Sequence, residues 1–468
     1  MSNADYLWTV ARGLRTQVRP HVGDDAACET LDNGIRVLTA VANALEPGPP
    51  ELPASATNGS DEAGADTDRL SGPPDNPAAY RNTAPAIARI ACAIREGAKG
   101  DAPREGIAWE KGLLDAAIGR MDAVERAAPE GEADDGSAIS PERLQAYLRQ
   151  WAGAEDVTIT AFRAVPGGRS RQTALLSVTG GGLPGDMVIQ RAFPGLAPNG
   201  IFLGERAQHD LLARLHEAGL RVPRPVLVET DPAPLDAPFL LVERAPGKPV
   251  QPDYWLPAEN EAVVLDLARE MALLHRQPID RLGRDLRAPG AARTTATWRA
   301  EMEDLAAKWN GMALWPSITM SAALEWMRAN VDCLDDRQCV IHNDMVFHNI
   351  LAQGDHITAV LDWEQCAIGH PGEDLGYCYP AVIAVTEWSR FMDIYREAGG
   401  ADVPQRQIDY FALRGCIRLM YLVLIGGRDS FQKGGGEGIL LASAGAHFTQ
   451  RLLHRITVIL ASILERNR

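Results

Sequence analysis

Polar side chains gather in one otherwise apolar segment of the chain, residues 340–350, which reads VIHNDMVFHNI. Its polar side chains belong to His342, Asn343, Asp344, His348 and Asn349. Polar groups are costly in a protein interior unless they are paired. The segment is therefore either a polar corner whose groups satisfy one another or a functional site. A further acidic residue, Asp362, ends an apolar run 18 positions after Asp344.

The order and spacing of these residues match the needs of phosphoryl transfer. An Asp at a loop tip can orient the acceptor hydroxyl and take up its proton. Mg²⁺, which meets the charge of a nucleotide, prefers a few hard oxygen ligands plus water, and an Asn amide and an Asp carboxylate can supply two. An H-x-D-x4-N loop followed by a short hairpin to a second Asp is the catalytic arrangement of kinases.

A glycine-rich turn, PGGRS at 166–170, lies between two β-like runs. Glycine lets backbone N–H groups approach phosphates closely. Alone, the turn would favour a plain hairpin. Together with the kinase-like loop it indicates a nucleotide site.

The elements that must position these residues change in type along the chain. Residues 4–45, 83–99 and 109–127 carry apolar residues at helical spacing. Residues 46–80 are rich in Pro, Gly, Ala, Ser and Asp and have too few large apolar residues to offset their ordering entropy. We therefore expect residues 1–140 to form a helical accessory domain with a flexible linker at 46–80.

After this region, short β-like runs separated by glycines predominate from residue 143, with one helical segment among them. Helical patterns dominate from residue 258 and enclose a single β-like stretch at 338–364. Strands followed by helices indicate an α+β fold with two lobes. We expect a small β-rich N-lobe at 141–250 and a large helical C-lobe at 251–468.

The composition excludes several classes of protein. The 468 residues exceed one ordinary core, and a formal net charge of −16 argues against general nucleic-acid or membrane-surface binding. The seven cysteines form no CxxC pair, which favours a reducing cytoplasm over a disulfide framework or a zinc site. The N-terminal residues lack the pattern of a signal peptide, and no apolar run reaches the roughly 20 residues that a membrane helix needs. We expect a cytoplasmic protein.

The segments HNDMVFHN and LDWEQCAIGHPGEDLGY resemble the aminoglycoside phosphotransferase family, the antibiotic-kinase-like branch of the protein-kinase fold. They are most similar to the subgroup found beside, or fused to, acyl-CoA dehydrogenases. Family members usually show H-G-D-x4-N, then L-D-W-E, G-D-P and D-L. The resemblance covers roughly residues 145–460 and implies a two-lobed kinase-like fold.

Carried over residue by residue, the resemblance implies a role for each polar residue of the C-lobe motifs. Asp344 would be the catalytic base, and His342 would hold the catalytic loop by hydrogen bonds. The residues implied at or beside Mg²⁺ are Asn349, Asp362 and Glu364, the last at the rim of the metal site. Asp374 would brace the loop structurally.

The resemblance extends to the nucleotide side of the N-lobe. PGGRS, with Gly167, Gly168 and Ser170, resembles the phosphate loop. FLLVERAPG resembles the hinge against adenine, with Glu243 and Ala245 offering backbone groups.

Four positions depart from the family pattern. Asn343 replaces the usual Gly, and His370 replaces the Asp of G-D-P. At the basic position of the strand MVIQRAF, which would contact the α- and β-phosphates, our preferred register places Gln190. Its ion-pair partner, a Glu in relatives, then falls at Gln208. A slip of one residue would instead give Arg191 with Glu205, and the sequence leaves both registers open.

These features predict a small-molecule O-phosphotransferase that uses ATP or GTP with Mg²⁺. The resemblance implies a hydroxyacyl-CoA or another catabolic hydroxyl compound as acceptor, and an aminoglycoside or macrolide antibiotic is the alternative. Gln190 and Gln208 also motivate a nucleotide-binding pseudokinase or scaffold. The expected partners are the nucleotide and the acceptor, not nucleic acid or membrane, and the N-terminal helices could mediate a homodimer.

Overall fold

The computed structural model describes most of the chain beyond residue 100. The described ranges are 101–126, 139–165, 171–192, 202–251, 257–283, 294–312, 317–433 and 436–466, with Trp255, Leu286 and short stretches within 7–39 and 90–94. The linker expected at 46–80 and the turn at 166–170 lie outside these residues. The chain forms two compact units, each described below by itself.

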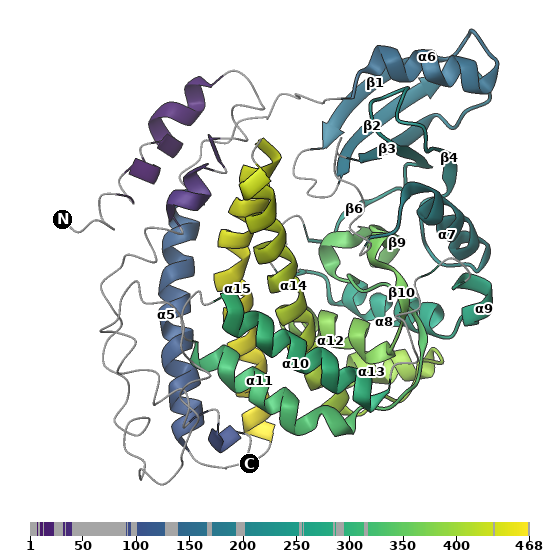
Figure 1. Ribbon diagram of the computed structural model, residues 1–468. Helices are drawn as coiled ribbons and strands as arrows, with labels where there is room; N and C mark the ends of the chain where they lie inside the picture. The colour runs from purple at the N-terminus through teal and green to yellow at the C-terminus, as the bar shows by residue number, and fades with distance from the viewer. Residues whose placement is uncertain are drawn as a thin grey trace. The chain divides into compact units, whose positions relative to one another are not determined.

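One unit, built from residues 133–292 and 337–404, carries the candidate site (Figure 1). It begins with helix α6 (Pro141–Ala152), whose Ser140 caps the N-terminus by accepting a hydrogen bond from the Arg143 backbone N–H. A five-stranded antiparallel sheet follows in the order β1-β2-β3-β5-β4. Its strands are β1 (Thr158–Val165), β2 (Arg171–Thr179), β3 (Asp186–Ala192), β4 (Pro225–Glu229) and β5 (Phe239–Glu243).

Alternation along the strands separates the two faces of this sheet. Met187 and Ile189 of β3 pack into one core cluster with Leu144 and Leu148 of α6. Residues of opposite parity on β3, such as Gln190, therefore lie on the other face. Helix α7 (Glu205–Glu217) lies between β3 and β4 in sequence and contacts β4 and β5.

The rest of this unit joins short strands to helices. The helices are α8 (Glu261–His275), α9 (Ile279–Leu282), α12 (Pro371–Val382) and α13 (Trp388–Glu397), with 3-10 turns η5 (Phe347–Asn349) and η6 (Trp363–Gln365). The strands β6 (Lys248–Pro249), β8 (Ile350–Gln353) and β9 (His356–Val360) form one small sheet, and β7 (Cys339–Ile341) pairs with β10 (Ala367–Gly369). The expected α+β composition is confirmed.

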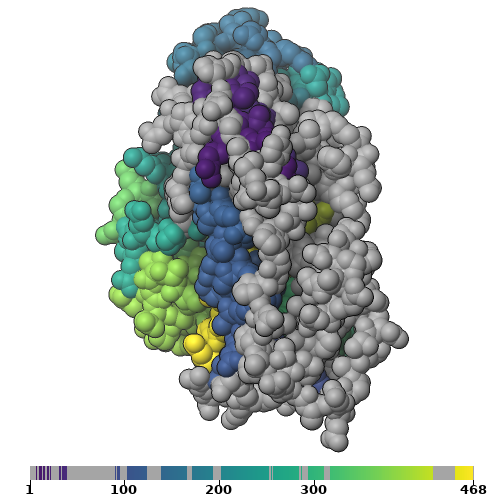
Figure 2. All heavy atoms as spheres, turned by 90° about the vertical axis from the view of Figure 1, so that its left-hand side faces the viewer, coloured from purple at the N-terminus to yellow at the C-terminus, as the bar shows by residue number. Residues whose placement is uncertain are grey.

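The other unit is helical in the residues described. Its helices are α5 (Asp101–Arg126), α10 (Thr295–Met312), α11 (Ile318–Asn330), α14 (Gln405–Lys433) and α15 (Gly436–Arg466), with the short turns η1 (Leu14–Val18), η2 (Arg19–His21) and η4 (Val331–Cys333). α5, part of which is visible in blue in Figure 2, packs against α15 and α11. α5 thus groups with α11 and with α15, the last helix of the chain. None of the helices in the described ranges has the length and hydropathy needed to cross a membrane.

A buried contact ties α5 to α11 in this helical unit. The Glu110 carboxylate accepts a 2.6 Å hydrogen bond from the Thr319 backbone N–H. Burial raises the Glu110 pKa, although this hydrogen bond and those of neighbouring groups on α11 oppose the shift. The N-terminal end of α11 is therefore held by a side chain from α5.

Candidate active site

The H-x-D-x4-N segment forms a loop between β7 and β8, and the β8–β9 hairpin returns the chain to its side. The Leu361 backbone N–H donates to the Asn349 carbonyl oxygen at 2.8 Å. Asn349 Nδ2 donates to the Asp344 backbone oxygen at 3.0 Å and to its Oδ2 at 3.1 Å. The segment that carries Asp362 therefore lies directly beside the loop that carries Asp344 and Asn349.

His342 fixes the shape of this loop from within. Its Nδ1 accepts from the Asp344 backbone N–H at 3.2 Å, and its Nε2 lies 2.9 Å from the Leu361 carbonyl oxygen. Since a carbonyl only accepts, Nε2 carries the proton. Burial lowers the pKa of His342, outweighing the nearby Asp374 carboxylate. A neutral imidazole thus links both halves of the site.

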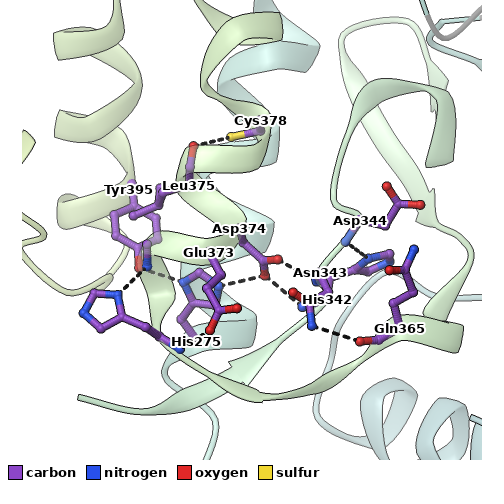
Figure 3. A network of polar contacts seen from close by, with 12 residues as sticks. His275, His342, Asn343, Asp344, Gln365, Glu373, Asp374, Leu375, Cys378 and Tyr395 are labelled. Carbon is purple, nitrogen blue, oxygen red and sulfur yellow. Dashed lines mark hydrogen bonds and ion pairs between the residues drawn. The ribbon is translucent and has the colours of Figure 1, made fainter. Parts of the chain in front are cut away.

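Asp374, at the start of α12, holds the backbone of this loop by hydrogen bonds (Figure 3). Its carboxylate accepts from the backbone N–H groups of His342 at 2.8 Å and Asn343 at 2.7 Å, and lies 3.0 Å from His275 Nε2. Burial opposes its ionisation, but the hydrogen bonds and charge around it outweigh burial and lower its pKa. His275 in turn lies 2.8 Å from the Tyr395 hydroxyl. Sequence analysis missed His275 because it lies on α8, far away in the chain.

Asn343 occupies the position where relatives have Gly. Its φ is 69°, in the left-handed region. Asn tolerates this region better than most residues other than Gly. Its side chain also donates from Nδ2 to the Gln365 carbonyl oxygen at 3.2 Å. Asn343 therefore holds a left-handed backbone conformation of the kind that glycine adopts readily.

An Asn343→Ala variant should be less stable by about 1–2 kcal/mol, because alanine pays the left-handed penalty and loses the bond to Gln365. Asn343→Gly serves as the matched control: it loses the same bond without strain, and we expect a smaller cost. Urea unfolding followed by circular dichroism measures both. Equal stabilities of the alanine and glycine variants would contradict the strain argument.

His370, which stands where the family motif has Asp, caps the N-terminus of α12. Its Nδ1 accepts from the Gly372 backbone N–H at 2.9 Å at the N-terminus of α12. Glu373 completes a capping box by accepting from the His370 backbone N–H at 3.0 Å. The helix that carries Asp374 is thereby capped without the usual Asp.

Asp362 differs from the other carboxylates because no group among the described residues hydrogen-bonds it. It has φ 63°, a left-handed conformation that costs energy in a non-glycine residue. Burial raises its pKa, while the charges of Arg171 and His342 act in the opposite direction. A partly buried carboxylate held without donors has the properties of a cation ligand.

The Asn349 amide supplies a second oxygen. Its nitrogen is bonded to Asp344, and within the described ranges nothing donates to its Oδ1. One carboxylate and one amide oxygen suit Mg²⁺, which keeps water and takes its remaining ligands from phosphates. The described part of the chain contains no group of three or more His, Cys, Asp or Glu side chains arranged for a metal.

Asp344 is 9% exposed, and its carboxylate points away from the Asp374 contacts (Figure 3). Its Oδ2 accepts from Asn349, which fixes the orientation of the carboxylate. Asp344, Asn349 and Asp362 thus come together, as the spacing in the sequence predicts.

The structure places Gln190 and Arg191 on opposite faces of β3. The Arg191 side chain is buried on the core side, where Nε donates to the Leu235 carbonyl oxygen at 2.7 Å and Nη1 bonds Gln172 Oε1. Burial lowers its pKa, and the charged groups that act on it are Asp236 and Arg143. Gln190 lies on the face turned away from this core, the position that our preferred register gives it.

Gln208 and Glu205, the two candidate partners on α7, both contact Arg171, which sequence analysis missed. Arg171 Nη1 donates to Gln208 Oε1 at 2.6 Å, and Nη2 lies 3.5 Å from Glu205 Oε1. Glu364, expected at the metal rim, lies with its Oε2 3.6 Å from Arg171 Nε. The signal in the sequence was a basic residue directly after the glycine-rich turn.

The residues expected to form the hinge lie at the end of β5 and just beyond it. The Glu243 backbone N–H donates to the Arg224 carbonyl oxygen at 2.8 Å, and its carboxylate pairs with the Arg224 guanidinium. Ala245 follows in the connection to β6. Gly167, Gly168 and Ser170 fall outside the described residues.

Known proteins resemble the part of the chain that carries the candidate site. Residues 161–415 match the model of the phosphotransferase enzyme family. Acyl-CoA dehydrogenase family member 11 from Homo sapiens is 28% identical over 257 residues, which are 50% of this chain and 30% of that protein. The protein of the same name from Gallus gallus is 31% identical over 172 residues, 35% of this chain and 21% of that protein. This chain thus matches less than a third of these relatives' length.

A solved structure shows the same fold. It belongs to a protein from Ralstonia eutropha that is provisionally named an aminoglycoside phosphotransferase, with a TM-score of 0.50 and 17% identity. The likeness covers 69% of this chain and 99% of that one. The resemblance and the kinase-like fold expected from the sequence are both confirmed.

Proposed function

Since this chain belongs to the phosphotransferase enzyme family, we propose that it transfers the γ-phosphate of ATP or GTP to a hydroxyl group of a small molecule, with Mg²⁺. The observation that carries this proposal is the convergence of Asp344, Asn349 and Asp362 beside one another, with the Asp362 carboxylate bonded by no donor in the described part of the chain. Such a carboxylate is costly unless a cation meets it.

Asp344 has a different role from Asn349 and Asp362 in this reaction. Asp344 Oδ1 faces the acceptor and accepts the proton of its hydroxyl, while Oδ2 is held by Asn349. The hydroxyl oxygen forms a bond to the γ-phosphorus as the bond from that phosphorus to the β-phosphate oxygen breaks, and the electron pair leaves with the nucleoside diphosphate. Mg²⁺, held by Asn349 Oδ1 and Asp362, would neutralise the charge of the phosphates. No covalent enzyme intermediate is required.

For the acceptor we propose a hydroxyacyl-CoA or another hydroxyl compound of catabolism. The support is the similarity to acyl-CoA dehydrogenase family member 11, which extends over 21–30% of those relatives. The antibiotic alternative rests on a fold likeness at 17% identity. The scaffold alternative rests on the neutral pair Gln190 and Gln208.

One assay separates these alternatives. The intact chain is incubated with Mg²⁺ and ATP or GTP in turn, together with hydroxyacyl-CoA thioesters of several chain lengths, an aminoglycoside or a macrolide. Nucleoside diphosphate release is followed, and mass spectrometry identifies the phosphorylated product. We expect acceptor-dependent turnover with a hydroxyacyl thioester. Turnover only with an antibiotic would overturn the acceptor assignment, and nucleotide binding without turnover on any acceptor would favour a scaffold.

A further inference from the structure

The nucleotide side of the candidate site lacks a basic residue at the position where the fold would place one. In our preferred register Gln190 occupies that position on β3, and Gln208 stands where its acidic partner on α7 is expected. A triphosphate brings several negative charges, and a fixed positive group in a low-dielectric site stabilises them far more than one in water. The positive charge must then come from another strand or helix.

The register of the sheet identifies a candidate. Thr173 of β2 pairs with Gln190 of β3, and Arg171 pairs with Ala192. Paired residues, and residues two apart on one strand, share a face. Arg171 therefore lies on the same face as Gln190, diagonally across from it, at a spacing of roughly 7–8 Å between backbones that a long side chain can bridge.

The contacts of Arg171 bring its guanidinium to the site from this position. Besides Gln208, it bonds the Leu203 carbonyl oxygen through Nη2 at 3.2 Å. Its ion pairs reach Glu205 on α7 and Glu364 on η6, two residues after Asp362. One guanidinium thus links β2, α7 and the segment of the proposed metal ligand.

The environment of this side chain favours a role toward an anion. The Arg171 side chain is only 9% exposed. A guanidinium has five N–H donors, and the neutral Gln208 amide takes the place of a carboxylate at its shortest contact. Arg171 therefore retains N–H donors for another acceptor. The neutral Gln208 also cancels less of its positive charge than a Glu at position 208 would.

We propose that Arg171, the first residue of β2, binds the phosphates of the nucleotide and replaces a basic residue at Gln190. With Gln190 and Gln208 in place, the positive charge has then moved from β3 to β2 and is not lost. This inference rests on the proposed nucleotide site. The alternative is a purely structural role, in which Arg171 only neutralises Glu205 and Glu364.

The test compares nucleotides that differ in phosphate charge. Calorimetry with Mg²⁺ measures the Kd of ATP, ADP and adenosine for the intact chain and for Arg171→Gln. We expect the variant to lose about tenfold or more in ATP affinity, with a smaller loss for ADP and an unchanged adenosine affinity. Unchanged ATP affinity, or equal losses for ATP and adenosine, would overturn the proposal.

A second test returns the positive charge to β3 and measures ATP affinity again. A purely structural role of Arg171 predicts no recovery of that affinity. Arg171→Gln combined with Gln190→Lys returns a cation to β3 on the same face. We expect this double variant to recover ATP affinity to within about threefold of the original chain. A double variant no better than Arg171→Gln contradicts the proposal.

Two further variants guard against misfolding. If Arg171→Gln fails to fold because Glu205 loses its partner, Arg171→Gln with Glu205→Gln removes both charges, and the same ATP-specific loss is expected. Arg191→Gln is the matched control, since this buried arginine faces the core: we expect a lower melting temperature and an unchanged ratio of ATP to adenosine affinity. If the original chain binds neither ATP nor GTP, the proposed function itself fails. If it binds ATP and the Arg171 variants bind equally well, only this inference fails.

Discussion

An Asp344→Asn variant is expected to lose about 10²–10⁴-fold in kcat while its KM for ATP stays within a few-fold. Asparagine keeps the size of the side chain and can still accept the hydrogen bond from Asn349 Nδ2, so the loop should retain its shape. It cannot take up the proton of the acceptor hydroxyl. The effect should therefore fall on the chemical step rather than on nucleotide binding.

Initial rates of nucleoside diphosphate release at saturating ATP measure this prediction. Asp355→Asn is a suitable control, because Asp355 is an exposed acidic residue at the β8–β9 turn and bonds only Asn260 among the described residues. It should retain the original kcat. An Asp344→Asn variant with the same kcat as the Asp355→Asn variant would show that Asp344 is not the base.

An Asp362→Asn variant is expected to separate activity from stability. Activity should fall by about 10²-fold or more in kcat/KM, with a higher Mg²⁺ concentration needed for half-maximal rate, because a neutral amide replaces the carboxylate at the metal. Stability should not fall. Burial raises the Asp362 pKa above its ordinary value, so the ionised form of this carboxyl costs folding free energy.

The direction of the change in stability of the Asp362→Asn variant is a direct test of this role. Asparagine removes the buried charge and tolerates the left-handed conformation at φ 63°. The melting temperature without nucleotide or Mg²⁺ should therefore stay the same or rise. Scanning calorimetry of both proteins measures this shift. A melting temperature lowered by several degrees would indicate that the Asp362 carboxylate holds the fold together instead of a metal.

The catalytic loop was predictable because its geometry is local. Asp344 and Asn349 lie on one short loop, and a hairpin of two short strands leaves little choice about where Asp362 returns. This inference needed only spacing along the chain. The sequence left Gln190 and Arg191 both open at the phosphate position, and it is the packing of Met187 and Ile189 in the core that places Gln190 on the opposite face of β3.

The remainder depended on pairing between distant segments. Arg171 joins the site because β2 pairs with β3 in one particular register, which no local pattern in the sequence specifies. His275 meets Asp374 across 99 positions of chain. The grouping of α5 with α11 and α15 likewise rests on contacts such as that between Glu110 and Thr319, so the domain boundaries at 140 and 250 stay a prediction.

The central claim is that Asp344, Asn349 and Asp362 enclose a Mg²⁺-bound nucleotide. A crystal structure of the intact chain with Mg²⁺ and a non-hydrolysable ATP analogue tests it most directly. We expect a metal ion at about 2.0–2.1 Å from Asn349 Oδ1 and from an Asp362 carboxylate oxygen, with phosphate oxygens completing its coordination. The γ-phosphate should face Asp344. A nucleotide bound elsewhere, or a metal that contacts neither Asn349 nor Asp362, would contradict the account.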